Sequence, residues 1–75
     1  MKELVEYLAR SIVSDPDQVK VTTEDQAGHL ILRLEVSPDD KGKVIGRQGR
    51  IAQAIRALLR VAAIKHGTRA TLEII

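Results

Sequence analysis

The sequence predicts an α+β fold in which a helix, two strands, two helices and a last strand follow one another. Apolar residues recur at the 3.6-residue spacing of helices near the N-terminus and again in the second half of the chain. Two alternating runs separated by a turn follow the first helix, and a third alternating run closes the chain. A chain of 75 residues suits one domain, so residues 1–75 are expected to form a single domain.

The first half of the chain predicts a helix and a β-hairpin. Apolar residues at helical spacing over residues 4–13 predict an amphipathic helix, which Pro16 and its neighbouring aspartates end. Side chains alternate over residues 19–23 and again over residues 30–36, which predicts two strands. Residues 25–28 are expected to form the turn between them, so the two strands are expected to pair as a hairpin.

The second half predicts two helices and a strand. Ser37 is a good capping residue, Pro38 suits the first helical position, and the two aspartates that follow favour the positive end of a helix. A longer helix is predicted over residues 49–66, with Gly67 just past its end, where a left-handed cap is common. Alternation over residues 70–74 predicts the last strand.

Charge is distributed unevenly along the chain. The segment from Lys41 to Arg69 contains eight basic residues and no acidic one, whereas nine of the ten acids precede it. A net charge of +2 is too small to indicate a nucleic acid by itself, but the basic half is where a phosphate-bearing partner is expected. Because acids interrupt the N-terminal apolar stretch and no apolar run is long enough to span a bilayer, we expect a cytoplasmic protein without a membrane partner.

Patterns typical of catalytic and metal sites are missing from the sequence. There is no cysteine, and the only histidines, His29 and His66, have no paired carboxylates near them in the sequence. The serines have no recognisable base partner, and the segment from Gly42 to Gly49 lacks the Gly-Lys-Ser/Thr ending of an NTP-binding loop. We therefore expect no enzyme activity, no catalytic residue, no cofactor and no small-molecule substrate.

The segment with the most specific functional signal joins the two predicted helices of the second half. Gly46 and Gly49 lack β-carbons, so a sugar-phosphate backbone can approach the main chain between them. Free N–H groups and the dipole at the start of the next helix attract phosphate, and Arg47 adds a planar donor fork. The simpler alternative is a corner between helices that uses glycine only for its geometry. The candidate RNA-binding residues are Lys43, Val44, Ile45, Gly46, Arg47, Gln48, Gly49 and Arg50.

The run Val44-Ile45-Gly46-Arg47-Gln48-Gly49 resembles the signature of KH domains, and the element order resembles their type II, prokaryotic topology. The resemblance covers the whole chain and is strongest to the small bacterial single-KH proteins of the KhpA family. It implies a three-stranded mixed sheet with helices packed on one face, and a cleft for about four nucleotides. Ala52 stands where many KH domains have a larger aliphatic residue, so a shallower groove floor is expected.

The same resemblance implies a non-catalytic function, as an RNA chaperone or post-transcriptional regulator. The implied partners are single-stranded RNA, a second copy of the chain, and a KhpB-type multidomain KH protein, also called EloR or Jag. The loop is then expected to bind the RNA backbone, with bases over an adjacent aliphatic groove. An alternative stays open, in which the chain is a protein-assembly module and RNA binding is secondary.

The long predicted helix is apolar over a wide arc, because its only polar residues between positions 51 and 64 are Gln53, Arg56 and Arg60. Its expected core face consists of Ile51, Ile55, Leu58 and Leu59. A second apolar stripe at helical spacing consists of Ala54, Ala57, Val61 and Ile64. Two interpretations of the second stripe stay open: the first helix covers it, or it is the interface of a symmetric dimer.

Overall fold

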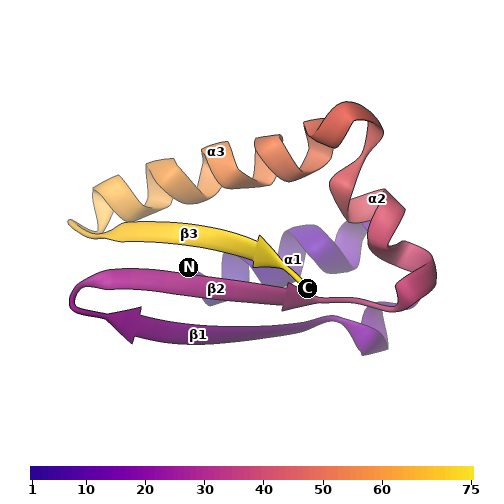
Figure 1. Ribbon diagram of the computed structural model, residues 1–75, viewed down its shortest axis with the longest axis horizontal. Helices are drawn as coiled ribbons and strands as arrows, with labels where there is room; N and C mark the ends of the chain where they lie inside the picture. The colour runs from indigo at the N-terminus through magenta and orange to yellow at the C-terminus, as the bar shows by residue number, and fades with distance from the viewer.

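Three strands form one sheet, and the helices pack along it (Figure 1). A computed structural model describes all of residues 1–75, and its elements follow the predicted order. They are α1 (Lys2–Ile12), β1 (Lys20–Gln26), β2 (His29–Glu35), α2 (Lys41–Ile45), α3 (Arg50–Lys65) and β3 (Arg69–Ile74). Single 3-10 turns lie between them at Pro16–Gln18, Pro38–Asp40 and Arg47–Gly49. The predicted α+β fold is therefore confirmed.

The central strand of the sheet is β2, which pairs antiparallel with β1 and parallel with β3. In the antiparallel pair Lys20 lies opposite Glu35, and in the parallel pair His29 lies beside Arg69. A parallel pair needs a long crossover, and α2 and α3 together supply it. The sheet is mixed, as the resemblance to KH domains implies, and β3 is an edge strand along which α3 runs (Figure 1).

The hydrophobic core lies between one face of the sheet and the helices. On β2 the fully buried Leu32 and Leu34 alternate with Arg33, so the apolar side chains share one face. Helices α1 and α3 both pack on that face, and α1 lies behind the sheet in Figure 1. The core residues are Val5, Ala9, Val19, Val21, Leu32, Leu34, Val36, Val44, Ile55, Leu59 and Leu72. The expectation that the helices pack on one face is confirmed.

The hairpin turn is shorter than the sequence predicts, because β1 continues through Gln26. The turn itself is formed by Ala27 and Gly28, whose φ angles are both positive at 54° and 86°. Two left-handed residues give the turn the twist that the flanking strands require. The Asp25 carboxylate accepts the N–H of Gly28 at 3.0 Å, so this acid stabilises the turn from its place in the strand.

The helix start at residues 37–40 differs from the prediction in its polar contacts. The side chain of Ser37 makes no capping hydrogen bond. The backbone carbonyl of Ser37 accepts the N–H of Asp40 at 2.8 Å instead. Asp40 is only 2% exposed, and its carboxylate accepts the N–H groups of Ser14 and Asp15, both at 3.1 Å. Asp40 was expected to favour the helix start through its charge. It instead anchors the connection between α1 and β1 to the beginning of α2.

Candidate nucleic-acid interface

The loop between α2 and α3 begins at Gly46, a position that the fold restricts to glycine. Its φ of 76° is left-handed, and a β-carbon there would lie 2.6 Å from the side chain of Ile51. Ile51 therefore packs directly against the main chain of the loop. Substituting Gly46 requires this large side chain and its backbone to shift, in addition to the strain of the left-handed conformation.

The loop continues through Gln48, which is exposed, and Gly49, which is half-buried. Both are left-handed, with φ of 56° and 73°. The N–H of Gly49 donates to the carbonyl of Gly46 at 3.2 Å, which closes the loop. A β-carbon at Gly49 would meet nothing within 4 Å, so the space above this residue is open. A ligand can therefore reach the main chain at Gly49, as the sequence predicts for a phosphate-binding loop.

The two arginines of this loop, Arg47 and Arg50, have no carboxylate partner in the protein. Arg47 and Gln48 are exposed, and the guanidinium of Arg50 donates to the side-chain oxygen of Gln48 at 3.1 Å. Neither arginine forms an ion pair. The N-terminus of α3 has no side-chain cap and no acid in its first turn. The loop thus combines free donors with the positive end of a helix, which is an arrangement that attracts anions.

The three candidate residues before the loop have different surroundings. Val44 is fully buried, so its side chain anchors the loop in the core and has no surface to offer a ligand. Ile45 is 40% exposed. The ammonium of Lys43 lies 3.4 Å from the carboxylate of Asp40 and also contacts the hydroxyl of Ser14. Lys43 is therefore the one candidate cation that forms an ion pair within the protein.

The role of Asp40 next to the loop was missed by sequence reasoning. The N–H of Ser14 is the largest contribution that lowers the pKa of its carboxyl, and the N–H of Asp15 and the ammonium of Lys43 act in the same direction. Burial acts in the opposite direction. The spacing of Asp40 and Lys43 is a local signal for the ion pair. The two N–H donors lie 26 and 25 residues away along the chain, where no local pattern finds them.

The second apolar stripe of α3 is exposed to solvent. Val61 is 54% exposed and Ile64 is 71% exposed, while Ala54 and Ala57 are exposed as well. The interpretation in which α1 covers this stripe is therefore wrong. Helix α1 lies beside an apolar groove of about 290 Å³ on α3, and Ala54 is the one residue of the stripe that lines this groove. The groove is lined by Leu8, Ile12, Arg50, Ile51, Ala54, Ile55 and Leu58.

The predicted core face of α3 is correct in part. Ile55 and Leu59 are buried, but Ile51 is 38% exposed and Leu58 is 50% exposed. The buried face of α3 is rotated about the helix axis relative to the predicted one, so that two alanines take the place of Ile51 and Leu58. Its buried residues are Ala52, Ile55, Leu59 and Ala63. Ile51 and Leu58 line the groove toward α1 instead, which adds to the apolar surface that α3 leaves exposed.

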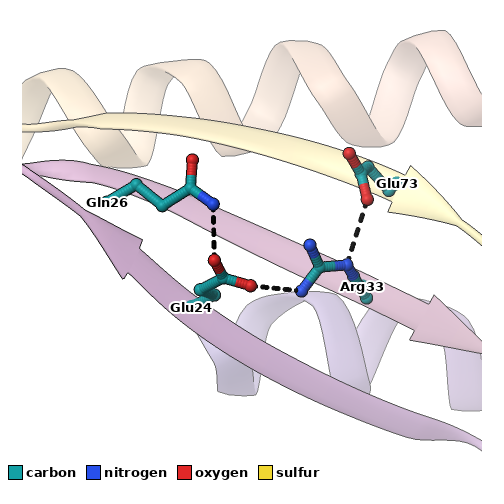
Figure 2. A network of polar contacts seen from close by, with 4 residues as sticks. All are labelled: Glu24, Gln26, Arg33 and Glu73. Atoms are coloured by element: carbon teal, nitrogen blue, oxygen red, sulfur yellow. Dashed lines mark hydrogen bonds and ion pairs between the residues drawn. The ribbon is translucent and has the colours of Figure 1, made fainter.

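The outer face of the sheet, opposite the helices, holds a polar network that the sequence did not predict (Figure 2). Arg33 on β2 donates to Glu24 on β1 at 2.8 Å and to Glu73 on β3 at 3.1 Å. Gln26 bonds to the same Glu24. The hydrogen bond from Gln26 is the largest cause that lowers the pKa of the Glu24 carboxyl. The hydrogen bond to Glu24 is in turn the largest cause that raises the pKa of Arg33. The charges of this network are satisfied within the protein.

The sequence profile described as the KH domain of KhpA and KhpB matches residues 2–74. The chain belongs to the KhpA/KhpB family of KH domains. A relative from Clostridium perfringens is 52% identical over 75 residues, and one from Clostridium acetobutylicum is 49% identical, each covering all of both chains. Both are named RNA-binding protein KhpA. The KhpA/KhpB KH domain is non-catalytic, which confirms the prediction that the chain is not an enzyme.

Solved structures of Era resemble the fold of this KhpA/KhpB family member. Era of Aquifex aeolicus bound to GDP and aluminium fluoride aligns with a TM-score of 0.63 at 19% identity, over 97% of this chain but 28% of that chain. Era in complex with MgGDPNP and nucleotides 1506–1542 of 16S ribosomal RNA aligns with a TM-score of 0.58. These similarities agree with the predicted KH fold. None of the helices here has the length and apolarity that crossing a membrane requires.

Proposed function

We propose that this chain binds single-stranded RNA without catalysing a reaction, and that it holds the strand by its backbone. The observation that carries the proposal is the loop from Gly46 to Gly49, with open space above Gly49 and with Arg47 free of any ion pair. Backbone donors and a guanidinium fork bind phosphate oxygens of any sequence. The relatives named as RNA-binding proteins support the same ligand.

Apolar surface beside the loop suits the bases. Ile45 and Ile51 are 40% and 38% exposed on the two sides of the glycines, so aliphatic carbon is available where bases of a held strand would lie. Ala52 is 3% exposed and faces the core, so its small size affects packing under the loop more than the surface itself. We propose that binding has little sequence preference, because the backbone contacts carry no base information.

Two double variants with equal changes of charge test this site. Replacing Arg47 and Gln48 by aspartate puts negative charge where phosphate docks and leaves both glycines in place. RNA affinity should fall at least about tenfold, which corresponds to roughly 1.4 kcal/mol. The control, Lys20→Asp with Thr22→Asp, replaces one cation and one neutral residue on exposed β1 positions and should bind RNA as wild type does. Equal affinity of the two folded variants in fluorescence anisotropy would refute the site.

We also propose that the chain forms a homodimer through the exposed stripe of α3. Ala54 and Ala57 are small enough to let a second helix approach closely, and Val61 and Ile64 supply apolar area. A stripe on one helix can pack against its own copy about a two-fold axis, as a symmetric dimer requires. Pairing two short RNA-binding surfaces raises the affinity for a longer strand through effective concentration.

The dimer is tested by Val61→Asp, compared with Tyr7→Asp on α1. Both residues are exposed and apolar, at 54% and 71%, but only Val61 belongs to the stripe. An unpaired charge buried at the interface costs on the order of several kcal/mol, so Val61→Asp should be a folded monomer with weaker RNA binding. Light scattering should show Tyr7→Asp as a dimer. A wild-type chain that is monomeric at high micromolar concentration would refute the dimer.

The exposed stripe also favours a second candidate function, which is protein assembly with RNA binding as a secondary property. In that case the partner surface serves a heterodimer with a KhpB-type multidomain KH protein in the cytoplasm, and RNA chaperone or regulatory activity belongs to the complex. RNA crosslinking of the native protein separates the two candidates. Strong crosslinks that the Arg47→Asp/Gln48→Asp variant loses support direct RNA binding, whereas crosslinks that only the Val61→Asp variant loses support assembly.

A further inference from the structure

The end of α3 opposite the glycine loop carries two adjoining hollows. In Figure 1 this end lies at the left, where the turn between β1 and β2 meets the start of β3. The first hollow, of about 480 Å³, is lined by Ala27, Gly28, His29, Gly67, Thr68 and Arg69. The second, of about 340 Å³, shares three of these residues and reaches α3. It is lined by His29, Arg60, Ala63, Ile64, Thr68, Arg69, Ala70 and Thr71.

The charge lining these hollows is positive only. Arg60 and Arg69 line them, no carboxylate does, and neither arginine forms an ion pair. Asp25 on β1 accepts the N–H of Gly28, but it lines neither hollow. The hydroxyl of Thr68 donates to the carbonyl of Gly28 at 2.7 Å, which joins the hairpin turn to the start of β3. This end of the fold is thus a fixed, concave and cationic surface.

A polar stripe on α3 connects the glycine loop with these hollows. Gln53, Arg56 and Arg60 follow at spacings of three and four, so they lie on one side of the helix, and Arg60 borders the second hollow. The helix has 16 residues, so its two ends are about 24 Å apart. About four nucleotides are held at a KH loop, so a longer strand extends past it.

We propose that Arg60 and Arg69, with the two hollows, form a distal basic site that binds phosphate groups of the RNA strand after it leaves the glycine loop. This proposal rests on the proposed function, because it takes the strand at the loop as its starting point. The polar stripe of α3 provides the path between the two sites. The distal basic site adds affinity only for strands long enough to reach it, and it is blind to sequence because it contacts phosphate.

The contrast with the outer face of the sheet supports phosphate as the ligand. There, Arg33 is held by two carboxylates and has no free charge to offer. At the distal basic site two arginines stand beside residues that are small or polar except for Ile64. One of the polar residues is His29, whose Nε2 lies 2.6 Å from the Thr71 hydroxyl. Guanidinium groups that have no carboxylate partner suit phosphate oxygens.

The test compares single-stranded RNAs of about four and about twelve uridines by fluorescence anisotropy across a salt series. The variant is Arg60→Gln/Arg69→Gln, and the control Lys2→Gln/Lys20→Gln removes the same charge at exposed positions that line neither hollow. The variant should bind the long RNA about tenfold more weakly than the control, with a salt slope smaller by about 1.4, and bind the short RNA equally. The single variant Arg69→Gln, away from the stripe of α3, should lower the slope by about 0.7.

The outcomes separate this proposal from the proposed function. Equal affinity of variant and control for the long RNA overturns the distal basic site, and so does a loss of equal size on both lengths. Light scattering on each variant shows whether the oligomeric state has changed. If the Arg60→Gln substitution changes the oligomeric state, the salt slope of the single variant Arg69→Gln tests the distal basic site instead. Arg47→Asp/Gln48→Asp should weaken both lengths. If that variant binds both normally, the proposed function fails, whatever the distal variants do.

Discussion

The outer face of the sheet and the glycine-loop side of α3 both present arginines. Only the arginines on the loop side have no ion pair and can offer their charge to a ligand. On the sheet, Arg33 is bonded to Glu24 and Glu73 in a closed network (Figure 2). Around the loop, Arg47 and Arg50 form no ion pair, although both surfaces are exposed. The comparison teaches that the number of basic residues on a surface says less about a phosphate partner than whether their charges are already satisfied.

The two surfaces also differ in what shapes the backbone under them. The strands of the outer face form a regular ladder that many side chains allow. The loop depends on left-handed residues and on the contact between Gly46 and Ile51. We therefore expect substitutions in the loop to cost more than substitutions on the sheet, and the expected effects on stability decrease from Gly46 through Asp40 to Arg33.

The largest effect is expected at Gly46. Gly46→Ala places a β-carbon against Ile51 in a left-handed conformation and should lower the free energy of unfolding by about 3 kcal/mol. Gly49→Ala meets open space, so only the conformational strain of about 1 kcal/mol remains. Urea denaturation of the two variants measures the difference. Equal losses at both glycines would mean that the close approach of Ile51 does not restrict the loop.

An intermediate effect is expected at Asp40, which braces α2 just before the loop. Asp40→Asn removes the charge that Ser14, Asp15 and Lys43 satisfy and should lower Tm at neutral pH by about 5 °C. The exposed neighbour Asp39 is the control, and Asp39→Asn should leave Tm nearly unchanged.

The same residue predicts a dependence of stability on pH. The pKa of Asp40 lies below its ordinary value of 3.8, so its stabilisation is fully present above that value and is lost as the pH falls through the folded-state pKa. The difference in Tm between wild type and Asp40→Asn should therefore shrink in acid. A difference that stays constant from neutral pH down to pH values well below 3.8 would contradict this assignment.

The smallest effect is expected on the outer face of the sheet. Arg33→Gln breaks two exposed ion pairs, and such pairs contribute little to stability in water. Tm should change by no more than about 2 °C, and RNA affinity should not change. A clear loss of RNA affinity for Arg33→Gln in anisotropy would break the comparison, since it would make the paired surface part of the binding site.

Sequence reasoning found the elements and the loop because their signals are local. The proline at position 16 and the glycine at position 67 mark ends of helices, and alternation marks the strands. The Gly46–Gly49 loop lies between the two helices, where the neighbouring residues and the helix patterns predict a junction, and its role in RNA binding stays a prediction. The turn was placed too early since Asp25 is a common turn residue, although here it acts from within β1.

What the sequence did not predict depends on contacts between distant segments. The donors to Asp40 lie 25 and 26 residues earlier in the chain, and Arg33 pairs with Glu73, 40 residues later. Periodicity showed that α3 has two apolar stripes, but it did not show where α1 packs. Ile51 and Leu58 were therefore expected in the core, whereas they line the groove between the two helices.

The most direct test of the central claim, that unpaired arginines of the loop contact phosphate while paired ones do not, is the salt dependence of RNA binding. Each phosphate contact of a single strand contributes about 0.7 to the slope of log K against log salt concentration. On an RNA of about four nucleotides, which is too short to reach the distal basic site, two to three contacts from Lys43, Arg47 and Arg50 should give wild type a slope of about −1.4 to −2.1. Arg47→Gln should reduce its magnitude by about 0.7, and Arg33→Gln should leave it unchanged. A flat response in wild type, or equal changes for the two arginines, would contradict the account.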